Sequence, residues 1–195
     1  ANGERTMFPD NGANADLEAS DLPSLDDIDG VYLSGYALLD FRSRDAVLAM
    51  IKKIKAAGKP IYFDPTTTGA MKIVSRDEVL SWVALMDGIL LNSEEALYLG
   101  DSNDVETAEE NLSKYTPLVV IKLGSKGAMA INGSEKAKVS AVTTNVVDTT
   151  GAGDSFAAGF IPKWLETSDL TQALSAGAAL AAKCVSSVGA RPPLN

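Results

Sequence analysis

Four short apolar runs recur at nearly even intervals along the chain, and each is followed by a segment with helical periodicity. The runs are VYLSG from Val31, IYFD from Ile61, GILLN from Gly88 and LVVIKLG from Leu118. Short, continuous apolar runs are typical of strands that are buried on both faces. Strand, helix and strand at this spacing predict right-handed crossovers and a parallel sheet.

The segments between these runs carry recognisable helix ends. Ser43 is expected to cap the helix RDAVLAMIKKIKAAG, and Gly58 suits a left-handed stop at its end. Ser75 and Glu78 have the spacing of a capping box. Further helices are expected after Asn92 and over VETAEENLSKY.

After the fourth run the rhythm changes to strand-like alternation. GAMAING and KAKVSAVTT are joined by Asn132 and Gly133, which predicts an antiparallel hairpin near residues 127–142. A helix from about Asp154 to Leu165 and a long helix over LTQALSAGAALAAKCVSSV are expected to follow. The sequence therefore predicts one α/β domain, with a doubly wound, mainly parallel sheet and helices on both faces.

Composition excludes several classes of function. With 17 basic and 26 acidic residues the formal charge is -9, and no basic patch could neutralise a nucleic-acid backbone. Histidine is absent, which excludes a histidine base, triad or metal site. The single cysteine, Cys184, excludes an intrachain disulfide and is expected to be a buried apolar residue. No membrane-spanning run or signal peptide is recognisable, so a cytoplasmic protein without a membrane partner is expected.

The segment DTTGAGDSFAAGF carries the strongest chemical signal. Gly151 and Gly153 allow a tight turn directly before a helix, and the N–H groups of residues 151–154 are then unpaired at the positive end of the helix dipole. Asp154 there has an ordinary interpretation as a favourable acid in a first turn. A cap, however, does not require a loop of small residues, which costs backbone entropy. A carboxylate beside such an anion hole can accept a hydroxyl proton while the N–H groups stabilise a phosphoryl group in transfer.

DTTGAGDSFAAGF resembles the C-terminal signature of the PfkB family, the ribokinase-like carbohydrate kinases. GANADL at Gly12, NSEEALYLG at Asn92, IKLGSKGA at Ile121 and SSVGARPP at Ser186 resemble further family segments, in the family's order. The resemblance covers essentially the whole chain and implies a ribokinase-like fold. The family's N-terminal region, with its substrate-gripping motif and most of its lid, has no counterpart here. The chain also starts without Met, in strand-like alternation, and is therefore expected to be the C-terminal part of a longer protein.

The resemblance implies roles for the residues that match the signature. Asp154 would be the catalytic base that takes the proton of a sugar hydroxyl as this hydroxyl attacks the γ-phosphate of ATP. The anion hole would be supplied by Gly151, Ala152 and Gly153.

The resemblance also implies a metal and phosphate site at Asn92 and Glu95, which match a pair that organises Mg²⁺, largely through water. The same two residues form a capping box by themselves, because Asn92 stands at the N-cap and Glu95 three positions later. Both roles are compatible, and hard oxygen ligands suit Mg²⁺.

The nucleotide loop of the family is matched by three residues, Gly124, Ser125 and Gly127. Lys122 precedes this loop, where many members have Thr, and is a further expected contact. Asp148 and Thr150 match positions that in some members are linked to a monovalent cation such as K⁺. FDPTTTG departs from the family, because relatives often carry Asn and Arg soon after the Asp-Pro. This departure argues against an anionic substrate that such an Arg would grip.

Two other kinase and cofactor motifs are absent: the P-loop pattern G-x-x-x-x-G-K-[ST] and the dinucleotide fingerprint after a first strand. A nucleoside kinase or a sugar-phosphate kinase of the same family remains an alternative, as does a nucleotide-binding module without catalysis. The presence of Asp154 argues against the last of these. A homo-oligomer is possible, and the expected small-molecule partners are a sugar and ATP.

Overall fold

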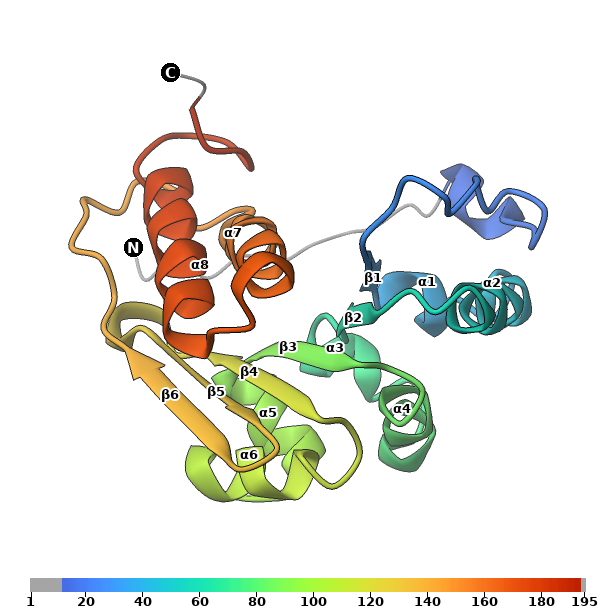
Figure 1. The fold of residues 1–195 in the computed structure, drawn as a ribbon, viewed down its shortest axis with the longest axis horizontal. Helices are drawn as coiled ribbons and strands as arrows, with labels where there is room; N and C mark the ends of the chain where they lie inside the picture. Colours follow the sequence, from blue (N-terminus) through green and yellow to red (C-terminus); the bar gives the residue numbers. More distant parts are fainter. Residues whose placement is uncertain (1–11, 194–195) are drawn as a thin grey trace. The chain divides into compact units, whose positions relative to one another are not determined.

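The computed structural model describes residues 12–193, whose helices and strands are labelled in Figure 1. The strands form a six-stranded sheet in the order β1-β2-β3-β4-β5-β6. Their bounds are β1 (Val31–Ser34), β2 (Ile61–Asp64), β3 (Gly88–Asn92), β4 (Leu118–Lys122), β5 (Ala128–Asn132) and β6 (Glu135–Val139). β1 runs parallel to β2 and β2 parallel to β3, whereas β5 and β6 are antiparallel. The predicted α/β class, with a mainly parallel sheet and one hairpin, is confirmed.

The chain forms two compact units that divide within β4, between Val119 and Val120. In the first unit the helical elements are η1 (Gly12–Asp16), α1 (Tyr36–Leu39), α2 (Arg44–Ala56), α3 (Thr68–Met71), α4 (Arg76–Val83), α5 (Ser93–Gly100) and α6 (Val105–Leu112). In the second they are η2 (Gly124–Lys126), α7 (Ala152–Thr167) and α8 (Leu170–Val185).

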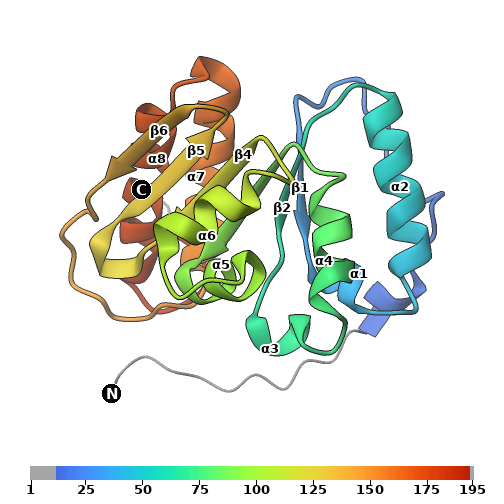
Figure 2. The same cartoon turned by 90° about the horizontal axis from the view of Figure 1, so that it is seen from below.

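The core of the first unit is built on β2 and β3. Ile61, Phe63 and the run Ile89–Leu91 are almost fully buried, as their continuous apolar sequence predicted. β1 differs from the prediction, because none of its residues is fully buried and Tyr32 is 38% exposed. The reason is its place at the edge of the sheet, where β2 is its only neighbour among the described strands (Figure 2).

The helix ends of this unit agree in part with those predicted from the sequence. Gly58 has a φ of +68° directly after α2, as predicted. Ser43 is the N-cap residue of α2, as predicted, but its side chain does not cap the helix. The serine hydroxyl donates to the carbonyl of Ala37 at 3.0 Å instead. Ser75 does cap α4 through the N–H of Glu78, but the side chain of Glu78 pairs with Arg44 at 2.8 Å.

The second unit packs two long helices against each other, and α8 also contacts β5 and β6. Small residues allow this approach, since a Cβ on Gly159 would stand 2.5 Å from the carbonyl oxygen of Ala176. Phe156 and Phe160 stack along α7 with ring centroids 6.0 Å apart. α7 begins two residues before the predicted Asp154 and ends two after Leu165. The hairpin and the buried Cys184 are confirmed.

The opening of the chain was predicted to be strand-like, and residues 1–11 of that prediction lie outside the described part. Its next residues, Gly12–Asp16, form a 3-10 helix rather than a strand. Within residues 12–193, no helix combines the length and the apolar character needed to cross a bilayer.

Candidate functional site

The turn before α7 is shaped by Gly151, which is the N-cap and has a φ of +73°. The first helical bond runs from the N–H of Ser155 to the carbonyl of Gly151 at 2.8 Å. The N–H groups at the start of α7 have no acceptor in an earlier turn of the helix. The prediction that all of them are unpaired is wrong for Ala152, whose N–H donates to the carbonyl of Thr149 at 3.3 Å. Asp154 lies in this first turn and is exposed. The turn thus combines the positive end of a 16-residue helix with an accessible carboxylate.

Asp148 holds the loop that leads into this turn. Its Oδ1 accepts hydrogen bonds from the N–H and the hydroxyl of Thr150, at 2.9 and 2.7 Å. Its Oδ2 accepts from the N–H of Gly189 at 3.0 Å, which ties in the closing loop of the chain. The thiol of Cys184 adds a contact of 3.4 Å to the carbonyl of Thr150. These bonds give Asp148 and Thr150 a structural role, which the sequence analysis did not foresee.

Gly151 is also packed against the closing loop. A Cβ on this glycine would stand only 2.1 Å from the carbonyl oxygen of Ala190. Two independent reasons therefore favour glycine at this position: the positive φ and the close approach of the carbonyl of Ala190.

Lys122 ends β4, and its side chain reaches the same turn. A Cβ on Gly153 would lie 3.3 Å from the Nζ of Lys122. The sequence placed Lys122 only before the nucleotide loop, and its contact with Gly153 depends on how β4 and α7 pack.

The predicted nucleotide loop is a single 3-10 turn, η2, closed by two glycines with positive φ. The N–H of Gly127 donates to the carbonyl of Gly124 at 3.0 Å, and that of Leu123 donates to Gly127 at 2.8 Å. A Cβ on Gly127 would meet the carbonyl oxygen of Val139 at 1.9 Å. Ser125 is exposed at the tip of this turn. The loop is thus held by its backbone against the end of β6, which leaves its outer surface accessible.

Asn92 and Glu95 form a complete capping box at the start of α5. The Asn92 Oδ1 accepts from the N–H of Glu95 at 2.9 Å, and the Glu95 carboxylate accepts from the N–H and the Nδ2 of Asn92 at 2.7 and 2.5 Å. Glu95 is only 5% exposed. The capping interpretation is therefore confirmed.

These two residues also fit Mg²⁺ chemically, but not as a preformed cage. Each carboxylate oxygen has two lone pairs, so the bonds to Asn92 leave capacity for water or a metal ion. Mg²⁺ retains several waters and often has only one or two protein ligands. Within residues 12–193, no group of three or more acids or cysteines is placed to hold a metal ion. This part of the site suits contacts through water rather than direct coordination by many side chains.

A second polar turn follows β2, within the segment FDPTTTG that departs from the family pattern. Thr66 there has a φ of +75° and is 8% exposed. Its N–H donates to Asp64 at 3.0 Å, and the hydroxyl of Thr68 donates to the carboxylate of Glu94. No local sequence signal predicts a positive φ at a threonine, so only the structure reveals this turn.

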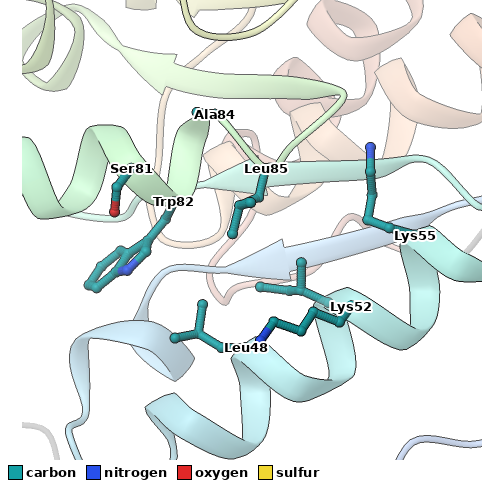
Figure 3. Close-up of a pocket in the computed structure, with 8 residues that line it drawn as sticks. Leu48, Lys52, Lys55, Ser81, Trp82, Ala84 and Leu85 are labelled. Atoms are coloured by element: carbon teal, nitrogen blue, oxygen red, sulfur yellow. The ribbon is translucent and has the colours of Figure 1, made fainter.

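A groove lies between α2 and α4 (Figure 3). It is lined by Leu48, Lys52 and Lys55 of α2 and by Ser81 and Trp82 of α4. It lies between two helices rather than at the strand ends and contains none of the predicted site residues. We assign it no function.

The structure thus brings several predicted residues together within each unit. In the second unit, Lys122 approaches the Gly151–Asp154 turn, and Asp148 binds Thr150 just before it. In the first unit, Asn92 and Glu95 contact each other directly.

Comparison with known proteins identifies the family of the chain. The profile of the pfkB family carbohydrate kinases matches residues 1–195. The chain is 34% identical over 183 residues to the 5-dehydro-2-deoxygluconokinase of Shouchella clausii, covering 84% of the chain and 55% of that protein. It is 32% identical over 205 residues to the ribokinase of Arabidopsis thaliana, covering 100% of the chain and 52% of that protein.

A similar solved structure is that of a fructokinase double mutant from Vibrio cholerae O395, bound to fructose, ADP and potassium ion. It has a TM-score of 0.80 and 26% identity, with 89% of this chain and 59% of that chain covered. The chain spans about half the length of the curated relatives that it matches. On the match over its whole length, the chain belongs to the PfkB family of carbohydrate kinases.

Proposed function

We propose that the protein is an ATP-dependent kinase that phosphorylates a hydroxyl group of a small sugar. The observation that carries this proposal is the turn from Gly151 to Asp154, where a left-handed glycine opens a helix N-terminus beside an exposed carboxylate. An anion-binding turn and a base within the same four residues meet the two main demands of phosphoryl transfer to an alcohol.

In the proposed reaction, ATP supplies the γ-phosphoryl group when it is bound with Mg²⁺. Asp154 accepts the proton of the acceptor hydroxyl as its oxygen forms a bond to the γ-phosphorus. The bond between this phosphorus and the oxygen of the β-phosphate breaks, and ADP leaves with that electron pair. The N–H groups at Gly151, Ala152 and Gly153 stabilise the negative charge of the phosphoryl group in transfer. Lys122 adds a positive charge beside Gly153.

The remaining predicted residues have supporting roles in this proposal. Gly124, Ser125 and Gly127 form the turn along which the nucleotide lies. Asn92 and Glu95 hold waters of the Mg²⁺ ion. Asp148 and Thr150 keep the loop before the anion hole in place, and a K⁺ ion bound near them would add to the same effect.

The test is ADP release by the protein expressed from its complete reading frame. Fructose, ribose and 5-dehydro-2-deoxygluconate would be compared with a nucleoside and with fructose 6-phosphate. We expect release that depends on one of the sugars and on Mg²⁺. Release with the nucleoside or the sugar phosphate alone would favour the alternatives within the family. ATP binding without release under any condition would indicate a module that does not catalyse.

A further inference from the structure

The turn after β2 contains a buried hydroxyl whose hydrogen bonding is incomplete. Thr66 is 8% exposed, and its Oγ1 has no hydrogen-bond partner among the described residues. Buried hydroxyl groups are nearly always hydrogen-bonded in proteins, and each exception requires an explanation. A ligand that forms the absent hydrogen bond is one such explanation.

The backbone at Thr66 points to the same conclusion. Of the described residues other than glycine, Thr66, Asp101 and Ser168 have a positive φ. Asp101 and Ser168 each end a helix, where the left-handed conformation is common. Thr66 has no such role, and a β-branched residue at a φ of +75° is a clear outlier. Strained residues of this kind are concentrated at binding and catalytic sites.

The neighbours of Thr66 fix this conformation firmly. The N–H of Thr66 donates to Oδ1 of Asp64 at 3.0 Å, and the carbonyl of Asp64 accepts from the N–H of Gly35 at 2.7 Å. A Cβ on Gly35 would stand 2.7 Å from the backbone of Pro65, so β1 and this turn are in direct contact. The hydroxyl is therefore held in a rigid frame at the carboxyl ends of β1 and β2. In open α/β sheets, ligands bind outside the carboxyl ends of the strands.

The charged side chains around this turn indicate which kind of ligand fits it. Asp64 bonds to Thr66, and Glu94 accepts from Thr68 two residues later. Residues 64–71 contain no lysine or arginine, and the ammonium of Lys72 lies over the ring of Tyr98, 5.7 Å from its centre. Where no cation lies between them, these carboxylates repel an anionic group. An uncharged polyol can donate hydrogen bonds to them and accept one from Thr66.

We propose that Thr66 is a specificity-determining residue whose hydroxyl hydrogen bonds to a hydroxyl of an uncharged sugar. The inference depends on the proposed function only in that this sugar is the acceptor substrate. Thr66 orients the acceptor and excludes sugars that carry a phosphate or carboxylate at this position.

The test compares Thr66→Val with Thr66→Ser in the protein expressed from its complete reading frame. Valine has the shape of threonine without the hydroxyl, and serine keeps the hydroxyl without the methyl group. Because the hydroxyl has no partner within residues 12–193, Thr66→Val is expected to melt at the same temperature as the wild type or above it. The matched control is Thr116→Val, because the buried Thr116 hydroxyl donates to the carbonyl of Met86 at 3.1 Å. This control is expected to lower the melting temperature without changing the KM for the sugar.

For Thr66→Val we expect the KM of the sugar to rise about tenfold, the effect of one hydrogen bond, with the KM of ATP unchanged. Thr66→Ser should stay close to the wild type. A saturating sugar should also raise the melting temperature of Thr66→Val by less than it raises that of the wild type. An unchanged sugar KM in Thr66→Val, or a wild type that prefers phosphorylated or carboxylated sugars, would overturn the proposal.

The melting experiment separates this proposal from the proposed function. If no sugar is phosphorylated but an uncharged sugar raises the melting temperature in a manner that depends on Thr66, the kinase proposal fails and the Thr66 proposal stands. If a sugar is phosphorylated equally well by the wild type and Thr66→Val, the reverse holds. If no sugar of either kind is phosphorylated and no uncharged sugar raises the melting temperature, both proposals are overturned.

Discussion

The side chain of Lys122 lies against Gly153, so that a Cβ on this glycine would stand 3.3 Å from the Nζ atom. Lys122 is the last residue of β4, and Gly153 is the second residue of α7. The end of β4 therefore places an ammonium group beside the first turn of α7. A cation at this position adds to the attraction that the helix dipole exerts on a phosphate.

Lys122→Met should weaken ATP binding, because it keeps most of the aliphatic stem and removes the charge. We expect the KM for ATP to rise roughly tenfold, as for the loss of one hydrogen bond to a charged group. Lys163→Met is the matched control, since Lys163 pairs with Glu166 on the surface of α7. Steady-state kinetics at fixed Mg²⁺ measure both variants. Equal KM values for ATP in both would remove Lys122 from the nucleotide site.

Asp154→Asn should reduce kcat by roughly 10²- to 10⁴-fold, the range expected for a general base, while ATP affinity changes little. Asparagine has nearly the same shape and cannot accept the proton. Asp169→Asn is a suitable control, because Asp169 caps α8 through the N–H of Gln172 at 2.9 Å and asparagine is also a good cap. Near-normal turnover in Asp154→Asn would rule out this residue as the base.

The sequence predicted those features that depend on local residue patterns. The strands of the first unit, the hairpin at Asn132 and the Asn92 capping box each have a signal within a few residues, and each is found. Features that depend on packing were not predicted. The hydroxyl of Ser43 bonds to Ala37 instead of capping α2, because the chain before the helix turns back toward it. The positive φ of Thr66 is imposed by its contacts around Asp64 and Gly35, which are 29 residues apart in sequence.

Glu95→Gln distinguishes a cap from a role in organising Mg²⁺. Glutamine can still accept from the N–H of Asn92 through its amide oxygen, but its NH₂ group cannot accept from the Nδ2 of Asn92. The free energy of unfolding should therefore fall by about 0.5–1 kcal/mol, the effect of one hydrogen bond. A role in holding Mg²⁺ waters would also raise the Mg²⁺ concentration needed for half-maximal rate. Ser75→Ala is the control, because Ser75 caps α4 through the N–H of Glu78 at 3.1 Å. If both variants lose stability and neither changes the Mg²⁺ dependence, Glu95 acts only as a cap.

Acid should destabilise the protein in part through two helix caps. The N–H of Thr107 holds the pKa of Asp104 below its ordinary value of 3.8, and the side chain of Gln172 does the same for the pKa of Asp169. A lowered pKa in the folded state contributes stability above pH 3.8 that is lost as the pH falls through the folded value. The double variant Asp104→Asn and Asp169→Asn keeps good caps without this titration. Its melting temperature should therefore decline less steeply below about pH 4 than that of the wild type. If the melting temperatures of the two proteins decline equally with falling pH, the two caps do not contribute to the acid sensitivity.

Gly151→Ala should be the most destabilising change in the turn before α7, for two separable reasons. Gly151 has a φ of +73°, and its Cβ would also collide with the carbonyl of Ala190 at 2.1 Å. Gly133 in the hairpin has a φ of +60° but has nothing within 4 Å of a Cβ, so Gly133→Ala measures the backbone term alone. We expect about 1–2 kcal/mol for Gly133→Ala, the usual cost of a left-handed alanine. Gly151→Ala should exceed this value, because the carbonyl of Ala190 must move as well. Urea unfolding of both variants without ligand gives the comparison, and equal losses would show that the loop at Ala190 yields without cost.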